Sequence, residues 1–113
     1  MAMISNLTID QGASFKAEID VKDADGDALD LTGFTGAGQM RKTYASSTAT
    51  NFTVEFKNPR TTGTLTISLT AAQTNAIKAG RYVYDVEITK TSDSEVTRVV
   101  EGQIDVTPGV TRA

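Results

Sequence analysis

Three aspartates within a five-residue stretch are the residues of this sequence whose spacing best suits metal chemistry. Asp23, Asp25 and Asp27 alternate with other residues, Gly26 lies among them, and Asp30 follows closely. Carboxylate oxygens at alternate loop positions are ligands that Ca²⁺ prefers, but the helix-flanked calcium loop is longer and ends on a bidentate Glu, which is missing here. Asp23, Asp25 and Asp27 are therefore candidate calcium ligands, and the spacing favours a hairpin turn. In that turn the Asp side chains cap the local backbone and Gly26 takes a positive φ.

The absence of His and Cys removes most other site chemistry. A Ser-His-Asp triad, a Cys-His dyad, an imidazole metal site, a zinc-thiolate site and a disulfide framework are all excluded. Asp85, Glu87, Glu101 and Asp105 could form acid–base pairs, but they are interleaved with Lys, Arg and Thr as on a solvated sheet face. We expect no catalytic residue and no cofactor, and hence a protein that is not an enzyme.

Charge and length limit the partners further. The 113 residues include 11 Lys and Arg against 14 Asp and Glu, for a formal net charge of −3. This balance argues against a nucleic-acid partner, since phosphate contacts need clustered Lys and Arg. No apolar stretch is long enough to span a bilayer, and the first ten residues lack the pattern of a secretory signal. We expect a single domain over residues 1–113, with 107–113 as a loose tail, and no membrane partner.

Seven β-strands are expected to position these residues. Thr accounts for about one residue in six, and Thr, Val, Ile and Tyr favour strands. Phe15, Ala17, Ile19 and Val21 alternate with charged residues, which predicts one buried and one solvated face. The expected strands cover residues 4–10, 14–22, 34–42, 52–56, 64–70, 81–90 and 95–106. Short strands separated by turns predict an all-β sandwich.

A short helix and two tyrosines between the fifth and sixth expected strands carry a first resemblance. Thr70 and Gln73 match a capping box, which predicts a helix of about two turns from residue 71. Tyr82 follows this helix at the start of the next strand, and Tyr84 comes two residues later. The segment resembles the E strand, E–F turn and F strand of an immunoglobulin-type domain, in which such a Tyr bonds back to upstream backbone. The usual Cys is replaced by Tyr84 and the usual Trp is absent, and plain core packing of both tyrosines stays open.

Six short segments, taken in order, carry a second resemblance. They are LTIDQGASF at 7–15, DLTG at 30–33, LTAAQT at 69–74, GRYVYDVEI at 80–88, RVVEG at 98–102 and VTPGVTR at 106–112. In this order they resemble small structural proteins of tailed bacteriophages, especially those of cyanobacterial and marine phages. The resemblance implies an immunoglobulin-like virion protein of the tail, baseplate, neck or capsid surface, made in the host cytoplasm. It also implies other virion proteins as partners, a homo-oligomer in the assembled particle, and no catalytic residues.

A different function remains open on sequence grounds. A free-standing recognition module could bind carbohydrate or a cell surface through its loops, with Tyr44 and Asn51 near the third loop as the candidate side chains. An aromatic content of only 6% argues against this alternative, because sugar sites usually expose aromatic rings.

Arg98 breaks the pattern of the last expected strand, because it falls on the parity predicted to face inward. A buried Arg would need a carboxylate partner. The side chain could instead reach solvent at the end of the sandwich or contact a neighbouring subunit, and the first of these two is the favoured interpretation.

Overall fold

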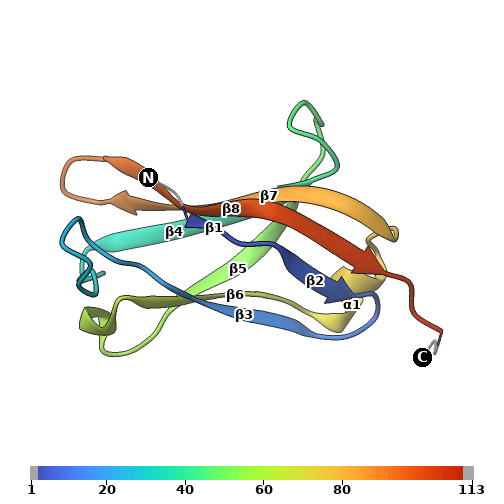
Figure 1. Cartoon of the computed structure of the whole chain (residues 1–113), viewed down its shortest axis with the longest axis horizontal. Coiled ribbons are helices and arrows are strands. Elements are labelled where there is room, and N and C mark those ends of the chain that lie inside the picture. Colours follow the sequence, from blue (N-terminus) through green and yellow to red (C-terminus); the bar gives the residue numbers. More distant parts are fainter. Residues whose placement is uncertain (1–2, 111–113) are drawn as a thin grey trace.

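The computed structural model describes residues 3–110, which fold into two facing layers of β-sheet (Figure 1). The strands are β1 (Met3–Ile4), β2 (Leu7–Asp10), β3 (Phe15–Asp20), β4 (Phe34–Arg41), β5 (Thr50–Phe56), β6 (Thr64–Leu69), β7 (Gly80–Lys90) and β8 (Val96–Thr107). A 3-10 turn, η1 (Arg60–Thr62), precedes β6, and a single helical turn, α1 (Ala71–Asn75), precedes β7. The mainly β architecture predicted from the sequence is confirmed. Within residues 3–110, no helix has the length and apolar character needed to cross a membrane.

The two layers share one strand. One layer contains β4, β7 and β8, with β1 and β2 lying parallel to β8 on its outer edge. The other layer contains β3 and β6, which are antiparallel. The beginning of β5, residues 50–52, pairs with β4, whereas residues 53–56 pair with β6 in the opposite layer. β5 therefore passes from one sheet to the other.

The core lies between the layers and consists of the apolar side chains that the strands alternate inward. Its buried members are Ile9, Ile19, Val21, Leu31, Met40, Phe52, Leu65, Ile67, Leu69, Ile77, Tyr84, Val86, Ile88, Val100, Ile104 and Val106. Burying each aliphatic side chain of this size contributes about 1.5–3 kcal/mol before the opposing loss of conformational entropy. The period-two alternation read from the sequence therefore identifies the core face of these strands.

The helical turn fastens one end of the sandwich. The Thr70 side chain accepts a hydrogen bond from the Gln73 N–H, and the Gln73 side chain accepts one from the Thr70 N–H, which confirms the capping box. The helix is shorter than the two turns expected. Thr74 is fully buried, and its hydroxyl donates to the Ala13 carbonyl (2.8 Å) and accepts from the Gly12 N–H (3.1 Å). These bonds join α1 to the turn between β2 and β3.

The first expected strand, 4–10, is divided into β1 and β2 by a break at Ser5 and Asn6. Gly102 of β8 explains the break, because a Cβ at this position would overlap the Ser5 carbonyl that passes over it. The Asn6 side chain accepts from the Gln103 N–H (3.0 Å) and the Ser5 carbonyl accepts from the Tyr84 hydroxyl (2.6 Å). The Ser5 N–H also donates to the Glu101 carbonyl (2.9 Å). Three hydrogen bonds therefore hold the segment of Ser5 and Asn6 where it passes over Gly102.

The inward parity of Arg98 in the last expected strand does not place its side chain in the core, and a β-bulge is the reason. Val86 of β7 lies opposite Val100 of β8, but the next residue, Glu87, lies opposite Arg98. One extra residue, Val99, is therefore inserted into β8, and the parity of the strand reverses before it. Thr97 takes the inward position opposite Ile88, and Arg98 is exposed on the outer face.

Candidate interaction site

One side of the sandwich is closed along only half of its length. β1 and β2 cover the outer edge of β8 from residue 100 to residue 107. Within residues 3–110, no strand covers that edge at residues 96–99, and none pairs with the outer edge of β3. Figure 1 shows β2 and α1 at the closed end, and the loop that connects β3 to β4 and the β7–β8 hairpin at the open end. We call the uncovered half the open side.

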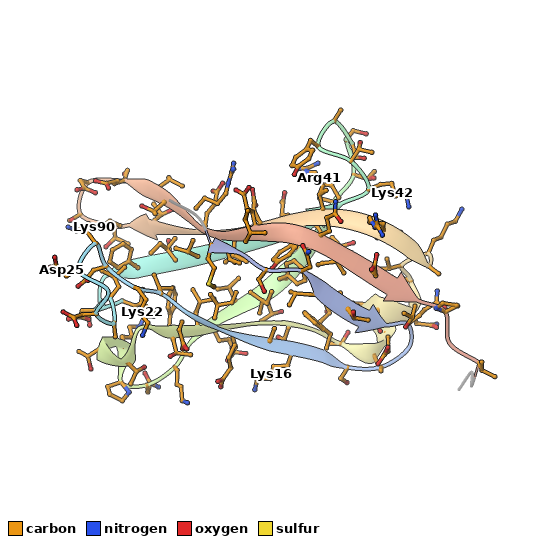
Figure 2. All side chains as sticks on the ribbon, viewed as in Figure 1. Lys16, Lys22, Asp25, Arg41, Lys42 and Lys90 are labelled. Carbon is orange, nitrogen blue, oxygen red and sulfur yellow. The ribbon has the colours of Figure 1, made fainter. Side chains whose placement is uncertain are left out.

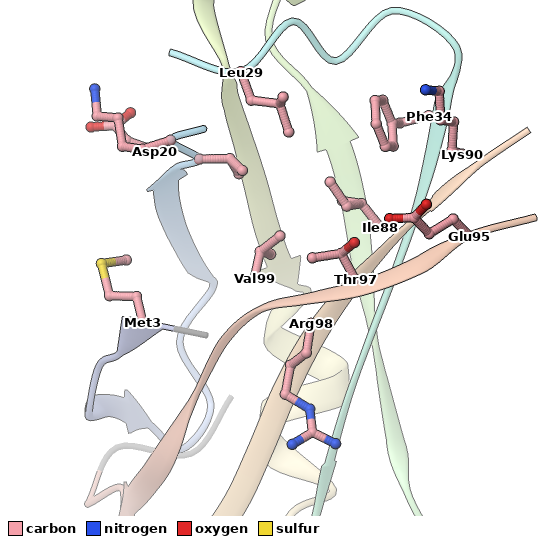
Figure 3. Close-up of a pocket in the computed structure, with 12 residues that line it drawn as sticks. Met3, Asp20, Leu29, Phe34, Ile88, Lys90, Glu95, Thr97, Arg98 and Val99 are labelled. Atoms are coloured by element: carbon pink, nitrogen blue, oxygen red, sulfur yellow. The ribbon is translucent and has the colours of Figure 1, made fainter. Parts of the chain in front are cut away.

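A groove of about 360 Å³ lies in the open side (Figure 3). Its apolar lining comes from both layers and comprises Met3, Val21, Leu29, Phe34, Ile88 and Val99. Charged residues, namely Asp20, Lys22, Lys90 and Glu95, stand around this lining, and Thr97 points between the layers. Arg98 is close by, but Figure 3 shows its side chain directed away from the groove. The groove is a gap in the apolar core that opens at a strand edge.

Large apolar side chains are exposed beside this groove. Met3, Ile4 and Val96 are 48%, 75% and 55% exposed, and they belong to β1 and to the uncovered start of β8. Tyr44 and Val110 are the other large apolar residues with this exposure among those described. Three of five such residues therefore gather at one strand edge, which is a typical feature of protein contact surfaces.

Arg98 is anchored on the outer face by two carboxylates. Its guanidinium lies 3.3 Å from the Asp85 carboxylate and donates to the Glu101 carboxylate at 3.1 Å. The hydrogen bond to Glu101 and the nearby charge of Asp85 raise the pKa of Arg98. The interpretation that Arg98 reaches solvent is confirmed, and these two carboxylates balance a surface cation rather than forming an acid pair. Asp105 similarly faces Arg81 across the strands at 3.3 Å.

The Asp23–Asp27 stretch is a hairpin turn. One oxygen of the Asp23 carboxylate accepts hydrogen bonds from the N–H groups of Asp25 (2.9 Å) and Asp27 (3.0 Å). The Asp23 N–H donates to the Asp27 carbonyl, and Gly26 has φ +85°, as the turn interpretation required. Among residues 3–110, no three carboxylates come together in a way that could hold a metal ion. The Asp30 carboxylate accepts a 3.0 Å hydrogen bond from the Thr32 N–H and so caps its own turn. Hydrogen bonds from Thr32 also lower the pKa of the Asp30 carboxyl.

The two tyrosines of the immunoglobulin-like segment have different roles. The Tyr82 hydroxyl donates to the Lys78 carbonyl (2.8 Å), four residues upstream, as the tyrosine of an E–F corner does. Tyr84 is buried with its ring edge-on to Phe52 at a centroid distance of 6.2 Å. Burial raises the pKa of Tyr84, while its hydrogen bond to Ser5 opposes that shift.

The two residues proposed for sugar binding lie in separate depressions. Tyr44 is 86% exposed on the loop between β4 and β5, where it borders a pocket of about 150 Å³ with Arg41 and Arg98. Asn51 lines a different pocket and accepts a 2.8 Å hydrogen bond from the Gln39 side chain. Figure 2 shows Arg41 and Lys42 at the base of the projecting loop.

Sequence reasoning missed the groove, because a groove depends on how far neighbouring strands extend along each other. The sequence did contain one sign of the bulge beside the groove. A charged Arg98 at a position expected to face inward indicates that the alternation of β8 is interrupted there. Because of the bulge, Thr97 takes the inward position at the groove.

Comparison with known proteins identifies the fold. No family model matches this chain, and no curated protein sequence matches it. Among solved structures, InlP from Listeria monocytogenes superposes with a TM-score of 0.51 at 13% identity, over 94% of this chain and 28% of InlP. The filamin domain of Lin-41 superposes with a TM-score of 0.50 at 16% identity, over 90% of this chain and 84% of that domain. The chain has an immunoglobulin-like fold. At these identities the likeness concerns the fold alone, and this chain spans less than a third of InlP.

Proposed function

We propose that this immunoglobulin-like domain is a non-enzymatic structural protein of a tailed-phage virion and that it acts through contacts between protein chains. The observation that supports assembly most directly is the open side, where an apolar groove meets uncovered strand edges. Exposed edges offer unpaired backbone groups to a partner chain. The phage assignment itself rests on the sequence resemblance.

The character of the groove favours contact over catalysis. Its floor is aliphatic and aromatic, and its charges come from Lys, Asp and Glu at the margin. A nucleophile needs an adjacent base and an orienting group, and the lining offers neither arrangement. Other virion proteins are the proposed partners, with several copies of the chain forming a homo-oligomer in the particle. Many modest contacts would then add through multivalency, without nucleic acid or membrane.

The decisive experiment is a mass-spectrometric inventory of purified particles. We expect the chain in gradient-purified virions at a constant ratio to the major capsid protein, and we expect it to stay after a high-salt wash. A chain that is abundant in infected cytoplasm but absent from purified virions contradicts the proposal. A non-structural phage protein of similar size, followed in the same gradient, controls for carry-over.

One observation favours a second function, the binding of carbohydrate by a recognition module. Tyr44 presents its ring to solvent beside a small pocket on the outer face of the sheet that Arg41, Asp85 and Glu101 also line. A glycan array with the purified domain tests this alternative, with Tyr44→Ala as the variant that should abolish binding. Binding that survives Tyr44→Ala, or no binding to any glycan, contradicts it.

A further inference from the structure

We infer that the groove of the open side accepts an extended segment of another protein chain, which adds as a strand beside residues 96–99 of β8. This inference rests on the proposed role in assembly and specifies the partner's chemistry. The added strand takes the place along β8 that β1 occupies from Val100 onward. The partner segment carries apolar side chains at alternate positions and an acidic residue near its end.

Backbone geometry at the start of β8 supports an extended partner. The Lys90 N–H donates to the Glu95 carbonyl (2.8 Å) and the Lys90 carbonyl accepts from the Ser94 N–H (2.8 Å), so both backbone groups of Lys90 point toward the chain that continues into β8. Pairs alternate along an antiparallel ladder, so Thr97 bonds toward β7 while the N–H and C=O of Val96 point to the open edge. Only an extended backbone satisfies such a row of edge groups in series.

The side chains at the groove support an apolar partner. Leu29, Phe34 and Val99 belong to the groove's apolar lining and pack against the buried core. Successive side chains of an added strand point to opposite faces, so every second one would enter the groove. Met3 already reaches the groove from the neighbouring position on β1, which shows that this strand position directs apolar side chains into it.

The charges at the margin support an acidic residue in the partner. Lys22 and Lys90 lie at the open end of the molecule (Figure 2), and neither is in an ion pair among the described residues. Of the two acidic side chains at the margin, Asp20 accepts a 2.9 Å hydrogen bond from the Thr64 hydroxyl, and only Glu95 stands without such a partner among the described residues. Unpaired cations therefore outnumber unpaired carboxylates there by two to one. A carboxylate on the incoming segment would therefore find an unpaired ammonium group at the margin.

Titration with a capped synthetic peptide tests this inference without requiring the natural partner. The probe is Asp-Val-Thr-Val-Thr-Val-Asp, whose ends are alike so that either strand direction can be tested. We expect chemical-shift changes in the ¹⁵N spectrum to centre on residues 96–99 and on Lys22. Saturating peptide should slow amide exchange of Val96 by about tenfold or more. The matched peptide with Lys at both ends should bind several-fold more weakly, and equal affinity overturns the acidic preference.

Variants of the domain distinguish strand addition from loose apolar contact. Val96→Pro removes the outward N–H but leaves the ladder to β7, and should weaken the peptide about tenfold. Val96→Thr keeps the N–H and the branched shape and should change affinity much less. If Val96→Pro does not fold, Thr97→Phe provides a second route, because its ring fills the groove and should abolish binding. Undiminished binding to Val96→Pro or to Thr97→Phe overturns the inference, and so does a response confined to the β3 edge.

The peptide experiment and the particle inventory test the strand-addition site and the virion role independently of each other. A chain found in virions whose purified domain ignores the peptide retains the proposed function and loses the strand-addition site. A domain that binds the peptide but is absent from virions retains the site and loses the virion role.

Discussion

The two halves of the sandwich's side differ in how their edges are completed. In the closed half, β2 pairs with four residues of β8, and the side chain of Ile9 in β2 is fully buried in the core. At the boundary with the open half, β1 has only two residues, both exposed, and β8 continues beyond it without cover among the described residues. The same strand edge is thus sealed at one end and available at the other. A β-sandwich can thus leave part of a strand edge unpaired while the paired remainder maintains stability.

Specific polar contacts fasten the closed half as well as apolar packing. Thr74 bonds to both sides of the turn between β2 and β3, and Tyr84 bonds to the Ser5 carbonyl at the break between β1 and β2. In the open half, the Thr64 hydroxyl donates to the Asp20 carboxylate and the Arg60 guanidinium donates to the Phe34 carbonyl, but among the described residues no such side-chain bond joins β1 or residues 96–99 to the opposite layer. We therefore expect substitutions in the closed half to reduce stability and comparable substitutions at the uncovered edge to leave it nearly unchanged.

The largest difference is expected from truncating one apolar residue in each half. Ile9→Ala removes a fully buried side chain, leaves a cavity, and should lower the free energy of unfolding by about 2–5 kcal/mol. Met3→Ala, at a side chain that is half exposed, should lower it by less than about 1 kcal/mol. Urea denaturation followed by circular dichroism measures both values. Equal losses for the two variants would show that the halves are equally important for stability.

The next effect concerns the buried hydroxyl of Thr74. Thr74→Val keeps the shape but removes the donor to Ala13 and the acceptor for the Gly12 N–H, and should cost about 1–3 kcal/mol. Thr66→Val is a matched control, since the Thr66 hydroxyl makes only a long 3.5 Å bond to the Glu55 carbonyl. A Thr74 variant as stable as the control would show that α1 does not fasten the turn.

A smaller effect, which depends on pH, is expected at Tyr84. Tyr84→Phe removes the bond to Ser5 and should cost about 1 kcal/mol at neutral pH. Burial holds the pKa of Tyr84 above its usual value of 10.0 in the folded protein. Above pH 10.0 the Tyr84 hydroxyl ionises in the unfolded chain before it ionises in the folded protein. Its contribution to the free energy of unfolding is therefore fully present below pH 10.0 and is lost as the pH rises through the raised pKa. The free energy of unfolding, measured by urea denaturation at several pH values in this range, should decrease more steeply with pH for the wild type than for Tyr84→Phe.

The smallest effect is expected at the turn of the open end. Asp25 contributes its N–H rather than its carboxylate to the turn, so Asp25→Ala should change stability by less than about 0.5 kcal/mol. Added Ca²⁺ or a chelator should leave the melting temperature of wild type and variant unchanged. A calcium-dependent rise in melting temperature that Asp25→Ala removes would restore the metal interpretation of this stretch.

Local patterns predicted those parts of the fold that depend on neighbours in sequence. The alternation around Ile19, the Thr70 and Gln73 capping box and the turn at Gly26 each specify their own geometry. Features set by distant residues were not predictable. The break after Ile4 depends on Gly102, nearly the whole chain away, and the passage of β5 between the sheets depends on both β4 and β6.

The candidate site belongs to this second group. The stretch of β8 without cover follows from the lengths of β1 and β2, and no motif encodes it. The bulge at Val99 has a trace in the sequence, the misplaced parity of Arg98, but that trace does not reveal the groove beneath it. Tyr82, in contrast, followed from a local corner motif, and its bond to Lys78 is the one expected.

The parallel pairing of the first and last strands determines how the molecule would carry tension. β2 and β8 run side by side in the same direction, and the chain enters β1 on one side of Figure 1 and leaves β8 at the far end. A pull between these two ends acts along the strands, so the hydrogen bonds from β2 to β8 are loaded together in shear rather than opened one after another. A domain held by both ends would therefore resist stretching until the hydrogen bonds between β2 and β8 break together.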